Sequence, residues 1–451
     1  MHRLLYVVVA MLILVTIGAD AAHAADRPNI LFVITDDQRW DSLGLTGHPF
    51  LETPNMDRIG REGAHFRNAF VTTPLCSPAR GSFLTGQYAH KHLITGNSIA
   101  YSEQSHRLVT FPMYLQRAGY YTGYVGKWHM GKDASARPGF DHWISFAGQG
   151  TFNDPVLNIN GQTKKHPGYL TDIISDFAAD FIRKSHDGKP FMLYVSHKAV
   201  HSPYTPAERH KDLYSDEPLP RRANVKADIS GKPMLTREGA KPPPAGGPVK
   251  DQLIRDQLRC LRSVDEGLGK ILAALEETGQ LDRTLVIFTS DNGYFWNEHR
   301  LGDKRAAYEE AIRIPLLMRY PPLIKPGTTI ETMVLNIDIA PTLLALAGAD
   351  RSPDMHGRSL LPLLAEPHAT LRDAALLENF HDPRFPHIAA WQAIRTPNWK
   401  YIHYPDLEGM DELYNLESDP FEMSNLIDAP EAADVLRTLR DRLAQSLRET
   451  P

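Results

Sequence analysis

The chain has 451 residues, a formal net charge of −5, 42% hydrophobic residues and only two cysteines. This length is sufficient for a large hydrophobic core and for two domains. Proteins that bind nucleic acid carry a strongly basic face, so the slightly acidic balance argues against nucleic acid as a partner. An anionic ligand would therefore require a local cluster of cations.

Residues 1–24 have the pattern of a secretory signal peptide. His2 and Arg3 precede an apolar run from Leu4 to Ile17, and Ala22-His23-Ala24 has the small residues of a cleavage site. The apolar run is shorter than the roughly 20 residues of a membrane span. We expect cleavage, no stable membrane span, and a secreted or periplasmic protein; the alternative is an uncleaved N-terminal anchor.

Short apolar runs alternate with helical patterns along the chain, which predicts an α/β fold with a mostly parallel sheet. Four runs end in polar side chains. NILFVIT precedes Asp36-Asp37, YYTGYVG precedes Lys127-Trp128-His129, FMLYVS precedes His197 and then His201, and TLVIFTS precedes Asp291-Asn292. Because ligands bind beyond the carboxyl ends of parallel strands, these side chains predict a site at one sheet edge.

The acidic residues at two of these strand ends indicate a metal site. Either pair alone could be an ordinary turn or N-cap. Three carboxylates at one edge would repel one another unless a cation lay between them. Oxygen ligands suit Ca²⁺ or Mg²⁺ rather than zinc, and this pattern leaves both ions open.

Cys76 lies in the stretch TTPLCSPARGSFLTGQY, at the start of a predicted helix. Ser77 as N-cap and Pro78 at the first helical position predict a helix to about Gly86. A thiol at a helix N-terminus is typical of a reactive thiolate. Such a thiol is a liability in an oxidising compartment, and sulfur is a poor ligand for a hard cation, so another chemical group is expected there.

The second cysteine has a different setting. Cys260 belongs to a helical pattern of Leu253, Cys260, Val264, Leu268, Ile271 and Leu275. This spacing predicts a helix that faces the core, with Cys260 as a small buried apolar residue. We therefore expect no disulfide between Cys76 and Cys260.

The string CSPAR followed by GSFLTGQY resembles the motif of the formylglycine-dependent sulfatases. ILFVITDDQ, GKWH, HKAVHSPY, FTSDNG, LGDKRAAYEEAIRIPLL, NIDIAPTLLALAG and HGRSLLPLL match the family in the same order over residues 28 to about 365. The C-terminal DELYNLESDPFEMSNL is also similar to sulfatase endings. The resemblance implies the alkaline-phosphatase-like sulfatase fold: a large mixed, mostly parallel sheet between helices, with a small C-terminal antiparallel sheet.

The resemblance also implies that a formylglycine-generating or equivalent maturation enzyme oxidises Cys76 to 3-oxoalanine (formylglycine). Its hydrate is a geminal diol, which would bind the metal together with Asp36, Asp37, Asp291 and Asn292. Such an all-oxygen site favours one Ca²⁺ over Mg²⁺.

In this implied mechanism, the metal and Arg80 would lower the pKa of one diol hydroxyl, whose oxygen would attack sulfur. Lys127, His129 and Lys304 would neutralise the sulfate oxygens, and His201 would protonate the leaving alcohol. The second hydroxyl would then lose its proton, expelling sulfate and restoring the aldehyde.

In isolation each of these residues also has a structural explanation, such as an ion pair, a packed histidine or a solvated charge. His197, His299 and Arg300 are further candidates for substrate contact.

We predict a catalytic domain at 25–365 and a C-terminal α+β subdomain at 366–451, with strands near AAWQAIR, KYIHY and DELYNL and a helix after Pro430. Residues 216–250 are rich in proline, glycine and charge. They are expected to form a flexible surface loop; the alternative is a flap that shapes the substrate site.

Two stretches, GQGTFNDPVLNINGQTKKHPGYLTDII and CLRSVDEGLGKILAALEETGQLDRTLVIFTSDNGY, are similar to N-acetylglucosamine-6-sulfatases. This implies a sulfated sugar or glycosaminoglycan-type substrate, with the 6-O-sulfate of N-acetylglucosamine as the first candidate. That group commonly has two adjacent cysteines where this chain has Leu75-Cys76, so other sulfated sugars stay open. The alternatives are a phosphodiesterase or phosphonate monoester hydrolase of the same superfamily, or a non-catalytic protein that binds sulfated glycans.

Overall fold

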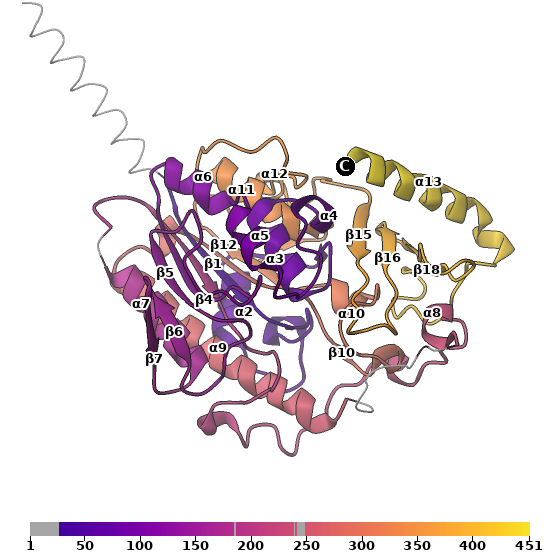
Figure 1. The fold of residues 1–451 in the computed structure, drawn as a ribbon, viewed down its shortest axis with the longest axis horizontal. Helices are drawn as coiled ribbons and strands as arrows, with labels where there is room; N and C mark the ends of the chain where they lie inside the picture. Colours follow the sequence, from indigo (N-terminus) through magenta and orange to yellow (C-terminus); the bar gives the residue numbers. More distant parts are fainter. Residues whose placement is uncertain (1–26, 185, 239, 241–248) are drawn as a thin grey trace, which may run out of the picture.

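The computed structural model describes residues 27–184, 186–238, 240 and 249–451. Its large sheet contains β1 (Asn29–Thr35), β2 (Ala64–Phe66), β4 (Tyr121–Lys127), β5 (His142–Phe146), β6 (Val156–Ile159), β7 (Gln162–Lys165), β8 (Phe191–Ser196), β9 (Thr284–Ser290), β12 (Leu316–Arg319) and β13 (Thr328–Ile330). The strand order is β13-β2-β12-β9-β1-β8-β4-β5-β6-β7 (Figure 1). The strands from β9 to β5 run parallel, whereas β12 and the β6–β7 hairpin are antiparallel. The predicted mostly parallel α/β fold is confirmed.

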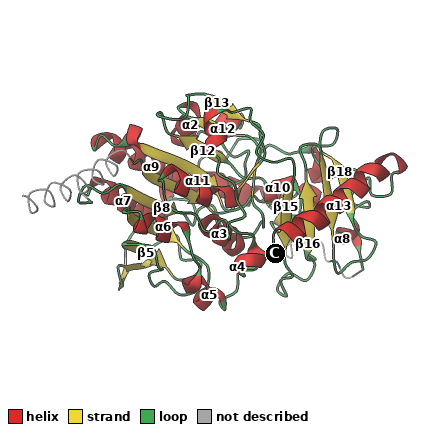
Figure 2. Cartoon of the chain, turned by 90° about the horizontal axis from the view of Figure 1, so that it is seen from above, coloured by secondary structure: helices red, strands yellow, loops and turns green. Residues whose placement is uncertain are grey.

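Helices cover both faces of this sheet (Figure 2). One face packs against α2 (Pro54–Arg61), α7 (Leu170–Arg183) and α9 (Asp251–Glu277), and the other against α3 (Cys76–Thr85), α6 (Phe111–Arg117), α11 (Ile339–Leu346) and α12 (Leu361–Ala365). Along β1, Leu31 and Val33 join the first core, whereas Phe32 and Ile34 join the second. Side chains of a strand alternate between its two faces, so β1 is buried on both sides.

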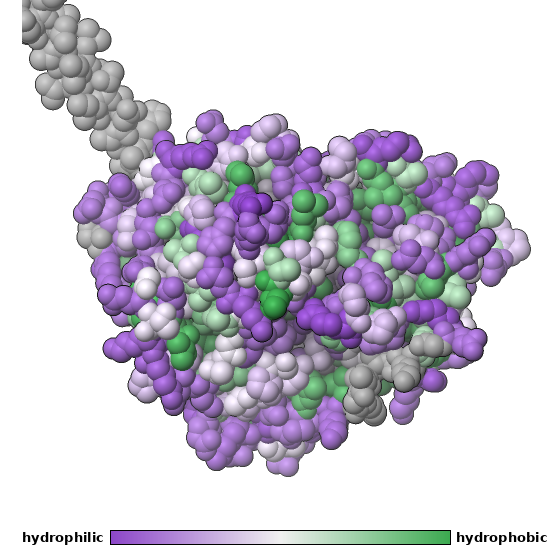
Figure 3. All heavy atoms as spheres, viewed as in Figure 1, coloured by the Kyte–Doolittle hydropathy of each residue, from purple (hydrophilic) through white to green (hydrophobic). Residues whose placement is uncertain are grey.

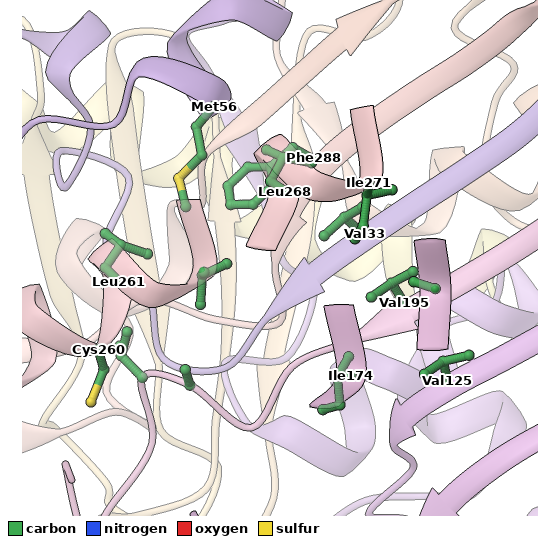
Figure 4. Packing of buried hydrophobic residues seen from close by; sticks show 14 of the residues in the cluster. Val33, Met56, Val125, Ile174, Val195, Cys260, Leu261, Leu268, Ile271 and Phe288 are labelled. Carbon is green, nitrogen blue, oxygen red and sulfur yellow. The ribbon is translucent and has the colours of Figure 1, made fainter. Parts of the chain in front are cut away.

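The long helix α9 forms much of the first core. Leu268 and Ile271 pack near Val33 and Phe288 of the sheet, as Figure 4 shows. Cys260 lies in the same cluster with no exposed surface. Both cysteines are unpaired. The predicted core helix, and the absence of a bond between Cys76 and Cys260, are confirmed.

The C-terminal part forms an antiparallel sheet in the order β15 (Ala375–Asn379), β16 (Trp391–Arg395), β17 (Trp399–His403) and β18 (Glu412–Asn415). The helix α13 (Ala433–Glu449) packs on this sheet and is drawn in yellow in Figure 1. Its core is continuous with residues of the first part, such as Phe70, Phe295 and Ile312. The small antiparallel sheet was predicted, although β15 was not; the boundary at residue 365 stays a prediction.

The remaining elements are short. The helices are α4 (Ala89–His92), α5 (Tyr101–Arg107), α8 (Pro233–Thr236) and α10 (Glu309–Ile312); the two-stranded pairs are β3 (Ala69–Phe70) with β14 (Val334–Leu335), and β10 (Phe295–Trp296) with β11 (Gly302–Asp303).

Part of the segment 216–250 is anchored by buried side chains. Asn224 and Met234 have no exposed surface, and Lys232 Nζ donates to the Tyr414 hydroxyl at 2.7 Å and to the Glu422 carbonyl at 2.6 Å. Residues 223–236 therefore lie at the surface but do not form the flexible loop that was expected, because buried side chains hold them against the C-terminal part. Residues 239 and 241–248 lie outside the described residues.

Hydrophilic side chains predominate on the face seen in Figure 3, with apolar ones in small separate patches. Within the described ranges, no helix is both long enough and apolar enough to cross a membrane. The predicted signal at 1–24 lies outside the described residues.

Candidate active site

The four strand ends named above meet at one edge of the sheet, because β9, β1, β8 and β4 are parallel neighbours in that order. Asp36 and Asp37 follow β1, and Asp291 and Asn292 follow β9. The Asp37 backbone N–H donates to Asp291 Oδ1 at 3.2 Å, and Asn292 Nδ2 donates to Asp37 Oδ1 at 2.6 Å. All four residues are buried. The parallel register therefore places three carboxylates and one amide side by side.

Cys76 is the first residue of α3, and its thiol lies 3.5 Å from Asp36 Oδ1. The N-cap is Leu75, not Ser77 as predicted, because the Ser77 hydroxyl donates to the His129 carbonyl at 2.7 Å. The helix ends as predicted, with Gly86 as C-cap at φ 68°. Burial, and then the charge of Asp36, raise the pKa of Cys76 above its usual range. The unmodified residue is thus a neutral thiol rather than a thiolate.

The residues at this edge fit a hard divalent cation. Ligand-type atoms of Asp36, Asp37, Cys76 and Asp291 all lie within 4.8 Å of one another. Asn292 Oδ1 is buried and has no hydrogen-bond partner among the described residues. An amide oxygen left without a donor is costly in a protein interior, and a cation would satisfy it. Oxygen predominates in this donor set, in agreement with the predicted preference for Ca²⁺ or Mg²⁺ over zinc.

Three cationic side chains surround the carboxylates. Arg80 Nε donates to Asp291 Oδ2 at 2.9 Å, and Arg80 Nη2 donates to Asp36 Oδ2 at 3.2 Å. Lys127 Nζ forms an ion pair with Asp36, and Lys304 Nζ donates to both Asp37 oxygens at 2.6 and 2.8 Å. Arg80 and Lys127 are buried, so solvent does little to screen their contacts with the carboxylates.

Burial and charge act in opposite directions on the carboxylates. Burial alone would raise the pKa of Asp36, but the charges of Lys127 and Arg80 hold it well below its usual range. Burial and the charge of Asp36 raise the pKa of Asp291 to about 7. Burial likewise raises the pKa of Asp37, although Lys304 opposes it. This uneven set of pKa values indicates excess negative charge that a cation would stabilise.

An open pocket of about 390 Å³ lies above this cluster, and its wall includes His129, His201 and Lys304. His201 Nδ1 lies 3.0 Å from the Ser202 carbonyl, and its Nε2 lies 4.0 Å from Asp37 Oδ2. His129 Nδ1 is buried without a partner among the described residues. Burial, reinforced by the charge of Lys127, lowers the pKa of both histidines. They are therefore neutral donors or acceptors until an anion binds nearby.

All ten predicted site residues come together in this region. Three weaker candidates do not reach the pocket wall: His197 and His299 have no exposed surface, and Arg300 lies on the surface elsewhere. Other residues complete the wall and were not singled out from the sequence: Asn97, Ser98, Ile99, Gly131, Lys132, Gly148, Gln149, Ser202, Asp303, Arg305, Arg384 and Phe385. Most come from loops with no periodic pattern, so no local signal identifies them.

Two further residues lie at this site and were not predicted from the sequence. Gln149 Nε2 lies 3.3 Å from His201 Nε2. Lys198, two residues after β8, donates to the Ser202 carbonyl at 2.7 Å. Burial and the charge of Lys127 lower the pKa of Lys198 to about 8. The only available signal for Lys198 is its position between His197 and His201.

The fold and this site define a hydrolase of sulfuric esters. The sulfatase family model matches residues 28–349, and the model of the N-sulphoglucosamine sulphohydrolase C-terminal region matches residues 297–449. The chain therefore belongs to the sulfatase family. Members of this family generally use a formylglycine and a divalent metal.

Several relatives are similar over nearly the whole chain. The N-acetylglucosamine-6-O-sulfatase of Bacteroides thetaiotaomicron is 33% identical, covering 94% of this chain and 87% of that protein. The human N-acetylglucosamine-6-sulfatase is 32% identical, covering 92% and 85%. A structure solved in complex with its substrate D-glucosamine-2-N,6-O-disulfate superposes with a TM-score of 0.86 at 32% identity, covering 94% of this chain and 98% of that one.

Proposed function

We propose that this sulfatase removes the 6-O-sulfate from N-acetylglucosamine or a related glucosamine residue of a sulfated glycan. The observation that carries the proposal is the juxtaposition of Cys76, three carboxylates and the histidines and lysine of the pocket wall. The sugar is inferred from the names of the relatives above and from the substrate bound in the similar structure. A phosphonate monoester hydrolase of Agrobacterium radiobacter shares the fold, with a TM-score of 0.76 at 24% identity, which supports the fold alone.

We infer that the cation is Ca²⁺, held by Asp36, Asp37, Asp291 and Asn292 together with modified Cys76. When present, the cation supplies Lewis acidity at the sulfate and the formylglycine supplies an oxygen nucleophile in place of the thiol. Cys76 is the first residue of α3, and the N-terminus of a helix favours negative charge on a side chain at that position. Arg80 and Lys127 keep Asp36 and Asp291 oriented, and their charges favour the ionised form of both carboxyls.

The pocket wall is suited to bind a sulfate ester. His129 and Lys304 reach the pocket and can donate to sulfate oxygens as negative charge develops. His201 is the proposed general acid: the Ser202 carbonyl fixes Nδ1, leaving Nε2 to carry a proton to the leaving alcohol. The negative charge of bound sulfate would raise the pKa of His201 toward the range in which it can hold that proton.

Export of the protein is part of the same proposal, since residues 1–24 would be removed as a signal peptide and a maturation enzyme would convert Cys76. The N-terminal sequence of protein isolated from its own host tests cleavage. Mass spectrometry of the peptide that contains Cys76 tests conversion.

A substrate panel tests the reaction. Fully converted protein should hydrolyse N-acetylglucosamine-6-sulfate faster than N-acetylgalactosamine-6-sulfate and far faster than the matched 6-phosphate. The Cys76→Ala variant is the control and should release no sulfate. Preference for the phosphate ester, or binding without turnover by converted protein, would overturn the proposal.

A further inference from the structure

Two adjoining pockets lie outside the catalytic pocket and share none of its lining residues. Their volumes are about 460 and about 440 Å³, and Trp40 and Arg313 line both. Together they form what we term the basic groove, defined by Trp40, Arg61, Arg67, Arg222, Arg313 and Arg395. Glu309 is the single carboxylate among its described lining residues.

Arg313 differs from the other arginines of the groove. Arg67 pairs with Glu331 at 3.0 Å, and Arg395 pairs with Glu309 at 3.2 Å. Arg61 and Arg222 pair with aspartates at 3.2 and 2.6 Å. In the part of the chain that the structure describes, Arg313 forms no ion pair; its guanidinium donates to the Arg67 backbone carbonyl, with Nε at 3.0 Å. The centre of the groove therefore has a cation with no carboxylate in direct contact among the described residues.

Trp40 holds two of these guanidinium groups close together. The Cζ atoms of Arg313 and Arg222 lie 3.9 and 4.8 Å from the Trp40 ring centroid. Stacking on an aromatic ring restricts a guanidinium without using its N–H groups; Arg313 Nε and Nη2 donate to the Arg67 carbonyl, which leaves Nη1 without a protein acceptor among the described residues. The pKa of Arg313 is lowered to about 10, mainly by burial and also by the charges of Arg395 and Arg222, whereas Glu309 opposes the shift. An anion bound here would relieve this repulsion.

We propose that the basic groove binds sulfate or carboxylate groups of an anionic glycan chain, at a site separate from the catalytic pocket. Guanidinium groups bind such oxyanions in a bidentate manner. The net charge of −5 gives no general attraction for polyanions, so a local cluster must supply it. The choice of a glycan rests on the proposed function, whereas the groove itself rests on the side chains described here.

The test measures binding and turnover separately. Full-length Cys76→Ala protein is titrated with a size-defined, heparin-type sulfated decasaccharide at low salt. We expect Arg313→Gln to weaken this binding about tenfold, because it removes a charge-assisted contact at the centre of the groove. In the converted enzyme, the same substitution should leave kcat/KM for a monosulfated monosaccharide unchanged.

Further variants keep the result interpretable. The double substitution Arg61→Gln with Arg67→Gln changes two exposed arginines of the groove. It should also weaken decasaccharide binding, and it tests the proposal even if Arg313→Gln fails to fold. Arg437→Gln removes an exposed charge from α13, outside the groove, and should bind like the parent. Unchanged binding by both groove variants overturns the proposal, as does equally tight binding of a DNA duplex of the same charge. If the converted enzyme does not turn over the monosaccharide, with or without the groove substitutions, the result would instead contradict the proposed function.

Discussion

His201 stands on the pocket wall with its Nδ1 beside the Ser202 carbonyl, an arrangement that suits proton donation from Nε2. We expect His201→Asn to lower kcat for a sugar sulfate about 100-fold, the usual contribution of a general acid. The loss should be small for an aromatic sulfate with a good leaving group, because a phenolate departs without a proton. Rates for both substrates measure this difference.

The control for this substitution is His368→Asn, which changes an exposed histidine. It should leave both rates unchanged. Equal losses of His201→Asn on the two substrates would show that His201 positions substrate rather than donating a proton.

Asp291 links the cation site to Arg80. We expect Asp291→Asn to lower kcat about 1000-fold even with Cys76 fully converted, because the site loses a negative ligand and Arg80 loses its partner. Metal analysis should show less bound Ca²⁺. Chelation of the parent enzyme should abolish turnover, and Ca²⁺ should restore it better than Zn²⁺. Full activity in metal-stripped enzyme would contradict this assignment.

Whether a site residue could be predicted from the sequence depends on the type of element that positions it. Asp36 and Asp291 could be predicted to meet, because each follows an apolar run and parallel strands end at the same edge. Gln149 and Arg384 could not, because irregular loops bring them to the pocket. Cys76 was recognised from its local motif, a stronger signal than periodicity.

At the scale of elements, apolar runs predicted β1, β4, β8 and β9 well, since strands buried on both faces read as continuous hydrophobic segments. The first residue of a helix was harder to predict than the bounds of these strands. Ser77 has the chemistry of an N-cap, but its hydroxyl bonds to the loop that carries His129. A tertiary hydrogen bond thus overrode the local preference. The segment 223–236 was wrongly expected to be flexible, because its composition gives no sign of the buried contacts that anchor it.

His90 connects α4 to β15 and to the end of α13: Nδ1 lies 2.8 Å from Glu378 Oε2, and Nε2 lies 2.6 Å from the Thr450 carbonyl. Burial alone would lower the pKa of His90, but Glu378 raises it overall. A histidine with a raised folded-state pKa contributes its full stability below its unfolded pKa and loses it as pH rises through the folded value.

We therefore expect His90→Gln to lower Tm by about 1–2 °C at pH 6 and by less at pH 9. Differential scanning calorimetry at the two pH values measures this change. Lys91→Gln is the matched control, since it removes a neighbouring exposed charge, and its effect should not follow this pH dependence. An equal loss for His90→Gln at both pH values would show that the charge on His90 contributes nothing.

At the scale of the whole molecule, the C-terminal sheet shares a hydrophobic core with residues of the first part of the chain. Phe70, Phe295 and Ile312 pack in one cluster with Leu376 and Trp391. Buried charges also cross this contact. Arg395 of β16 and Lys400 of β17 pair with Glu309 of α10, at 3.2 and 3.1 Å. Removing the sheet would expose a large apolar patch and leave Glu309 without its cations.

A chain that ends at residue 365 should therefore fail to fold alone, even though that position was predicted as a domain boundary. We expect it to aggregate or to show no cooperative thermal transition, because the apolar surface that the sheet covers would face water and Glu309 would lose both of its cations. The matched control is the full chain cut by a protease site inserted near Pro367, whose two pieces stay associated and should melt cooperatively. A monomeric 1–365 protein that melts cooperatively within a few degrees of the full chain would show instead that the catalytic part is an independent domain, and that the shared core contributes little.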